Sequence, residues 1–188
     1  MSHSIDFDSI EARLFTLHHA ALGSKAFCER FKISRMSQQP SEYEWVQYFG
    51  HLKALVSGTM IDAAIKIRML QDFARHEDED FDVNALQAEA SDGLNFGHLE
   101  SNGAPLSLRD SCNKIIHATG AKLVWQDVGD GEDAFEYWGG VYRLFGADQS
   151  GREWVAAVSV PDWCTAMMRF NMGFQLKIDW NHVVKWDE

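Results

Sequence analysis

One long apolar stripe in the first half of the chain constrains the fold more than any other feature. Its members recur every three or four residues: Trp45, Phe49, Leu52, Val56, Met60, Ala63, Ile67, Leu70 and Ala74. This period is typical of the buried face of an α-helix, and Ser41 with Glu44 forms a capping box that would begin the helix. A helix over 41–75 spans about 52 Å at 1.5 Å per residue, well beyond the usual helix length. It must therefore pack along much of its length against a partner, or kink near Gly58.

A second helical stripe precedes this one. Its apolar positions are Ile10, Leu14, Leu17, Ala21, Cys28 and Phe31. Asp8 and Glu11 have the spacing of a helix start, whereas Gly23 beside Ser24 predicts a break or kink, because glycine weakens a helix interior. We expect the two long helices to form an antiparallel pair.

The apolar pattern weakens after the second helix. The stretch His76–Pro105 is acidic and contains several glycines, so it indicates a long loop with one short helix around Val83–Ala90. The next stretch, Ser107–Asp110, is a second capping-box-like start. The helix that follows is expected to run through His117 and to stop at Gly120.

The apolar period then changes to that of β-strands. The segments predicted as strands are 122–126, 135–145, 152–160 and 176–180. An acidic turn is expected at 127–133, because Asp and Gly favour turns. Pro161 suits a first helical turn, so a helix is predicted over 161–170, with Gly173 as its end.

The chain is therefore expected to be an α+β protein. The predicted architecture is a long antiparallel N-terminal helix pair packed with a later helix, plus a small antiparallel β-sheet with one C-terminal helix. Residues 1–188 are taken as a single domain, mainly helical over 1–120 and rich in β-hairpins over 121–188.

The net charge of −11 is concentrated in the middle of the chain. From His76 to Glu136 there are fourteen acidic residues and three basic ones, whereas the remaining acids and bases cancel. A strongly acidic surface disfavours a nucleic-acid or membrane partner. We therefore expect no membrane contact, and nucleic acid only where a partner surface completes the site. A basic protein is a candidate partner for the acidic segment His76–Glu136.

Three widely spaced cysteines, Cys28, Cys112 and Cys164, form no CxxC pair. This spacing disfavours a disulfide framework or a cysteine zinc site, so buried reduced thiols are expected. No metal or cofactor motif stands out, and we expect neither group. The first residues lack the features of a signal peptide, and no apolar run is long enough for a membrane span. A cytoplasmic location is therefore expected.

Three polar residues, Arg109, Asn113 and His117, recur every four positions and so share one face of the helix predicted after Ser107. A histidine beside a polar partner can act as general acid or base near neutral pH, and the forked guanidinium of an arginine can hold a phosphate. This face is the candidate catalytic site.

The stretch Leu108–Ala118 resembles the signature of HEPN domains, which are helical units built on a long antiparallel helix pair. Many HEPN proteins are metal-independent RNases of toxin–antitoxin and defence systems. Asn113 and His117 match two positions of that motif, Cys112 stands where the motif usually has arginine, and Arg109 lies one turn earlier. The resemblance implies that, in an active protein, His117 is the acid–base group, Arg109 clamps the phosphate and Asn113 orients them.

Two functions are open on these residues. In one, Asn113 and His117 stabilise a half-buried helix, and the chain is a non-catalytic interaction or small-ligand-binding protein that forms a homodimer. Aromatic residues on both faces of the predicted strands favour this hypothesis, because a two-sided apolar sheet must be covered or paired with another chain. Trp138 and Tyr142 would then line a ligand pocket or a dimer face. The alternative is a metal-independent RNase that uses His117, Asn113 and Arg109.

Overall fold

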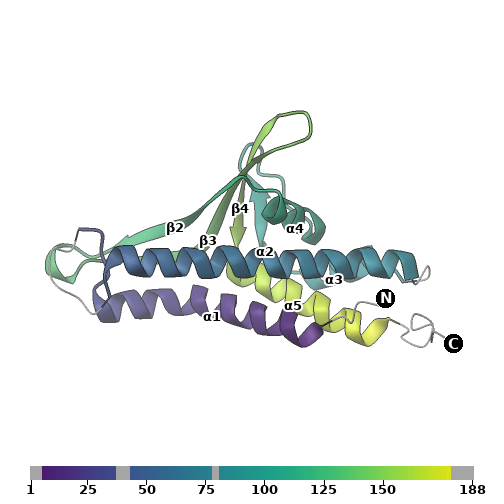
Figure 1. Ribbon diagram of the computed structural model, residues 1–188, viewed down its shortest axis with the longest axis horizontal. Coiled ribbons are helices and arrows are strands. Elements are labelled where there is room, and N and C mark those ends of the chain that lie inside the picture. The colour runs from purple at the N-terminus through teal and green to yellow at the C-terminus, as the bar shows by residue number, and fades with distance from the viewer. Residues whose placement is uncertain (1–5, 37–42, 78–80, 179–188) are drawn as a thin grey trace.

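The computed structural model describes residues 6–36, 43–77 and 81–178. In chain order, the elements are α1 (Phe7–Phe31), α2 (Trp45–Glu77), α3 (Val83–Ser91), β1 (Gly97–Leu99), α4 (Leu108–Ile116), β2 (Gly120–Val128), a 3₁₀ turn (Gly131–Asp133), β3 (Phe135–Ala147), β4 (Glu153–Ser159) and α5 (Val160–Lys177). The helices and one antiparallel sheet confirm the predicted α+β class (Figure 1).

The first two helices lie side by side and antiparallel, as predicted (Figure 1). Asp6 begins α1, because its side chain accepts a hydrogen bond from the Ser9 N–H at 2.9 Å. The predicted break at Gly23 is wrong, since α1 continues through that position. Its neighbour Ser24 is buried against α2, with its hydroxyl 3.0 Å from the Tyr48 hydroxyl. Tertiary packing therefore outweighs the low helix propensity of glycine at this point.

Helix α2 is unbroken over its 33 residues, about 50 Å at the usual rise. Its first turn includes a hydrogen bond from the Tyr48 N–H to the Glu44 carbonyl at 3.0 Å. The capping box predicted at Ser41 lies outside the described residues. Two neighbours support the length of α2: α1 packs along one side, and α4 packs along another. The long apolar stripe thus meets partners rather than kinking at Gly58.

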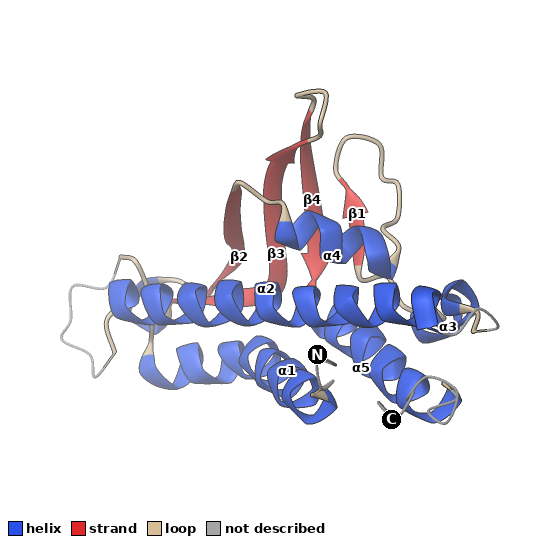
Figure 2. Cartoon of the chain, turned by 45° about the vertical axis from the view of Figure 1, so that its right-hand side comes forward, coloured by secondary structure: helices blue, strands red, loops and turns tan. Residues whose placement is uncertain are grey.

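The sheet has the strand order β1-β4-β3-β2, and each neighbouring pair is antiparallel. Register is regular except for an irregularity in β2 between Leu123 and Trp125. Along β3, Tyr142 and Leu144 are buried, whereas Val141 and Arg143 on the opposite face are only half-buried. One face of the sheet therefore belongs to the core, and Figure 2 shows α2 and α4 in front of it.

Several elements differ from the sequence-based expectation, including α4, which was expected to continue to Gly120 and ends at Ile116. Strand β1 was not predicted, because it has three residues and lies in a segment with few apolar side chains. Helix α5 runs to Lys177, so neither the helix end at Gly173 nor the strand over 176–180 is correct for the described residues, which end at 178. A Cβ atom at Gly173 would lie 2.6 Å from Leu86 Cδ1 of α3. This glycine lets two helices approach and does not end one.

No helix among the described residues combines the length and the apolar composition that a membrane span requires.

Candidate functional site

Helix α4 carries the candidate residues, and the predicted capping box begins it. The Asp110 N–H donates to Ser107 Oγ at 3.0 Å, and that hydroxyl donates to Asp110 Oδ2 at 2.6 Å. Leu108, Cys112 and Ile115 point into the core. This orientation turns another side of α4, with Arg109 and Asn113, toward α2.

A carboxylate on α2 holds two arginines from two different helices. Arg109 Nη2 lies 3.0 Å from Asp72 Oδ1, and Arg68 Nη2 lies 3.1 Å from Asp72 Oδ2. Burial opposes ionisation of Asp72, but the hydrogen bond from Arg109 and the charge of Arg68 outweigh it and lower the pKa of this carboxyl. The site therefore has an ionised carboxylate between two guanidinium groups.

Asn113 belongs to the same network. Its Oδ1 accepts a hydrogen bond from Arg68 Nε at 3.0 Å, so Arg68 bridges Asn113 and Asp72. Arg68 also donates to Gln71 Oε1 at 3.1 Å, and Gln71 donates to Gln87 of α3 at 3.3 Å. The network thus connects α2, α3 and α4 through side chains that are mostly buried or half-buried.

His117 lies apart from this network. It is the C-cap of α4, its N–H donates to the Asn113 carbonyl at 3.0 Å, and its side chain is exposed. Within the described part of the chain, its imidazole makes no hydrogen bond or ion pair. Eight residues of helix place it about 12 Å from Arg109 along the axis. The structure brings Arg109 and Asn113 to one network, and it does not bring His117 there.

Cys112, at the motif position usually held by arginine, is a core residue. It is 0% exposed, and burial raises the pKa of its thiol to about 12 despite the charge of Arg68 nearby. Cys28 and Cys164 are also free and buried, so the prediction of buried reduced thiols is confirmed. Among the described residues, no group of three or more potential metal ligands comes together.

The predicted ligand-binding aromatics lie inside the core. Trp138 is 0% exposed, and its indole N–H donates to the Val141 carbonyl at 2.8 Å. The Tyr142 hydroxyl lies 2.7 Å from Ser57 Oγ of α2, and burial raises the pKa of Tyr142. The first contact lies within β3, and the second joins the sheet to α2. Binding of a ligand by Trp138 and Tyr142 stays a prediction.

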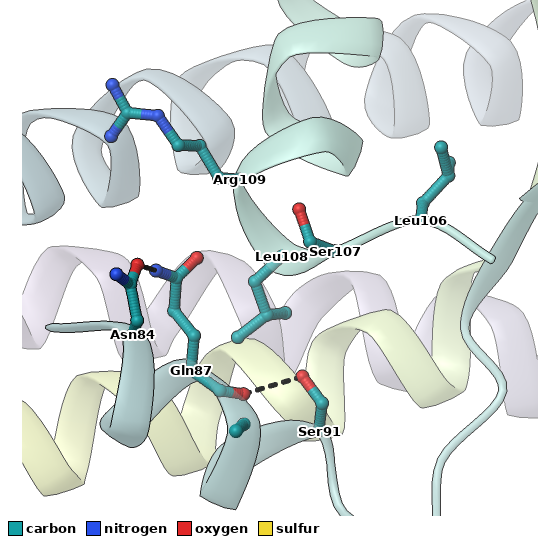
Figure 3. A pocket seen from close by; sticks show the side chains of 8 residues that line it. Asn84, Gln87, Ser91, Leu106, Ser107, Leu108 and Arg109 are labelled. Carbon is teal, nitrogen blue, oxygen red and sulfur yellow. Dashed lines mark hydrogen bonds between the residues drawn. The ribbon is translucent and has the colours of Figure 1, made fainter.

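A pocket of about 380 Å³ opens between α3 and the N-terminal end of α4 (Figure 3). Its lining consists of Asn84, Gln87, Ala88, Ser91, Leu106, Ser107, Leu108 and Arg109. Most of its polar atoms already have partners: Gln87 donates to Asn84 Oδ1 at 3.4 Å, and Ser91 donates to the Gln87 carbonyl at 2.7 Å. In Figure 3 the Arg109 side chain extends away from Ser107 and Leu106. The pocket therefore offers a polar ligand few free groups besides Arg109 Nη1, which is buried and has no hydrogen-bond partner among the described residues.

The sequence did not reveal Arg68 or Asp72 as partners of the motif. The available signal was their i,i+4 spacing on one face of the long helix, which is common in exposed ion pairs. Their contacts with α4 join residues 37 and 45 positions apart in the chain. No local pattern predicts such a pairing.

No protein-family model, curated protein or solved structure matches this chain.

Proposed function

We propose that this chain is a non-catalytic interaction protein that acts as a homodimer. The observation that carries the proposal is the engagement of Arg109 and Asn113 with α2: Asp72 neutralises the first, and Arg68 donates to the second. Side chains used in this way stabilise the packing of α4. A phosphate or a reacting group would have to compete with Asp72 and Arg68 for these side chains, although Arg109 Nη1 itself has no hydrogen-bond partner among the described residues.

The position of His117 supports the same proposal. RNA cleavage of the HEPN type would require an acid–base group and a phosphate clamp around one phosphodiester. His117 lies at the far end of α4 from Arg109, and its exposed ring lacks a partner among the described residues that would fix its orientation. An HEPN-like origin remains compatible with the helix pair and α4, and it stays a proposal.

Charge distribution limits where a basic partner would bind the acidic segment His76–Glu136. Several of its carboxylates already pair with bases from elsewhere in the chain: Glu136 with Arg35, Glu100 with Arg143, Glu89 with Lys177 and Asp133 with Lys32. Asp127 near the end of β2 and Asp130 in the turn between β2 and β3 are exposed carboxylates. A basic partner is therefore expected to bind at this turn, with an affinity that salt weakens.

An RNase assay tests the non-catalytic proposal. The wild-type chain, His117→Ala and the control His98→Ala are incubated with a fluorescent single-stranded RNA without added metal. We expect no cleavage above the buffer background in any of the three. Cleavage by the wild type and His98→Ala that is lost in His117→Ala would overturn the proposal in favour of the metal-independent RNase.

A further inference from the structure

The side of the helix pair that faces away from the sheet and α4 carries an unusual number of exposed apolar residues. We call this surface the outer face. Its largest apolar side chains are Phe15 (60% exposed), Leu22 (67%), Ile61 (42%), Ile65 (42%) and Met69 (55%). Scattered single exposed apolar residues are ordinary, whereas an apolar group gathered on one surface marks an interaction site.

The outer face has the residue spacing of a helix-packing surface. On α1 its positions are Ala12, Phe15, His19, Leu22 and Ala26, and on α2 they are His51, Ala54, Gly58, Ile61, Ile65 and Met69. Successive positions are three or four residues apart on both helices, as in the seam between packed helices. Each helix therefore has two apolar stripes, one in the core of this chain and one without a partner among the described residues.

Charge on this surface lies at the boundary between the helices and not on the two apolar stripes. None of the eleven outer-face positions on the two helices is Asp, Glu, Lys or Arg, although 24% of the chain is charged. At the boundary between the helices, Arg13 and Lys66 pair with Asp62. The two apolar stripes offer no charged group to a partner that binds by charge. An apolar partner surface could pack on them without burying an unpaired charge.

The outer face contains both a groove and bulky side chains of a kind that could occupy such a groove in another copy. The groove, of about 360 Å³, runs between α1 and α2. Its lining consists of Ala12, Arg13, Thr16, Ala54, Leu55, Gly58, Thr59 and Asp62. Ala12, Ala54 and Gly58 leave it open because their side chains are small, and the bulky Phe15 and Ile61 stand beside it. A two-fold interface requires a surface that is complementary to itself, and a surface that contains both shapes offers what such an interface needs.

The size of the outer face also suits a dimer. The 25 residues of α1 extend about 37 Å, and two helices packed 8–10 Å apart present a face roughly 18–20 Å wide. The product is about 700 Å² per copy, or about 1,400 Å² in total, which falls within the 1,200–2,000 Å² range of stable interfaces. The open face of the sheet is a weaker candidate, because it would bury Lys122 and Arg143.

We infer that a second copy of this chain packs on the outer face, so that two helix pairs form a four-helix interface. This inference rests on the proposed homodimer and specifies its contact surface. The isologous arrangement places the Phe15 and Ile61 side chains of each copy against the groove of the other.

Sedimentation and light scattering of the full chain over a range of concentrations test the interface. Leu22→Glu and Ile61→Glu place a carboxylate on the outer face at positions exposed in one chain, so the fold should survive, and circular dichroism checks this. Met172→Glu, at a 52% exposed position of α5, is the matched control, and Val124→Glu probes the open sheet face. We expect the wild type to have twice the chain mass of 21.4 kDa. The dissociation constant of the dimer should rise at least tenfold in the two outer-face variants. It should be unchanged in Met172→Glu and Val124→Glu.

The remaining outcomes separate the inference from the proposed function. A dimer that Val124→Glu disrupts and Ile61→Glu does not would overturn the interface and retain the homodimer. A wild-type chain that stays monomeric at 100 µM would overturn both. Photocrosslinking from benzoylphenylalanine at Leu22 identifies the occupant: crosslinks between isotopically distinct copies support the inference, and crosslinks within one copy, to its own residues 179–188 for example, contradict it.

Discussion

Replacing Asp72 by asparagine tests the network that holds α4 against α2. The substitution keeps the shape of the side chain and removes the charge that Arg68 and Arg109 share. These arginine side chains are 17% and 28% exposed, and that of Asp72 is 49% exposed, so solvent screens the two contacts in part. Exposed ion pairs contribute about 0.2–1 kcal/mol each. The two contacts, both half-buried on the arginine side, should together contribute about 1–2 kcal/mol to the free energy of unfolding.

Thermal unfolding followed by circular dichroism measures this effect. For a chain of this size, 1 kcal/mol corresponds to about 2–4 °C in Tm, so Asp72→Asn should lower Tm by about 3–6 °C at pH 7. Asp127→Asn removes an exposed carboxylate of β2 and serves as the control, with Tm unchanged. A double-mutant cycle with Arg109→Met isolates the coupling between the two side chains.

The pH dependence gives a second measure of the same contact. Because the two arginines lower the folded-state pKa of Asp72 below its ordinary value of 3.8, the ionised carboxylate stabilises the fold fully above the unfolded-state pKa. This stabilisation is lost as the pH falls through the lower, folded-state pKa. The Tm difference between wild type and Asp72→Asn should therefore hold from pH 7 to about pH 5 and shrink below about pH 4. A difference that is absent at pH 7, or that is the same at pH 7 and pH 2.5, would refute the reasoning.

Two further outcomes follow from the packing of the helices and the core. Gly173→Ala should lower Tm, by the equivalent of about 1 kcal/mol, because its Cβ would press on Leu86 of α3. Gly23→Ala should raise Tm by a similar amount, because a Cβ there meets nothing within 4 Å. Equal changes in Tm for the two substitutions would contradict this explanation. In the native chain, the three buried cysteines should react with a thiol reagent only at the rate at which the chain unfolds. In guanidinium, all three should react at once. Fast reaction of any one cysteine in the native chain would show that its site is open to the reagent.

The helical part of the fold was predictable because its signals are local. The stripe that begins at Trp45 and the capping box at Ser107 each specify an element from residues close in sequence, and α2 and α4 form where these signals occur. The C-terminal part was less predictable because a glycine can either end a helix or allow two helices to pack closely. Gly173 matches a helix end in sequence, and its actual role is to leave space for Leu86, which lies 87 positions earlier.

The candidate site was predictable only in part for the same reason. The i,i+4 spacing correctly places Arg109 and Asn113 on one side of α4, since both reach the same network. The spacing does not predict where the helix ends. Helix α4 ends at Ile116, and His117 is its C-cap with an exposed ring. Similarly, the sequence marked Trp138 and Tyr142 as notable aromatic residues of one strand. It did not show that one side of that strand is buried and the other half-buried, with both residues on the buried side.

The order of contacts along the chain has a consequence for folding. Helix α1 packs against β3 and α5, both of which are synthesised after it. Glu11 of α1 accepts hydrogen bonds from Asn171 and Gln175 of α5 at 3.2 and 3.1 Å. Contacts over such separations slow folding, because long loops must close before the contacts form. During synthesis, α1 can pair with α2 early, but the side of α1 that packs on β3 and α5 has no partner until those elements leave the ribosome. The nascent chain therefore exposes this apolar side of α1 during much of its synthesis, and such exposure favours aggregation.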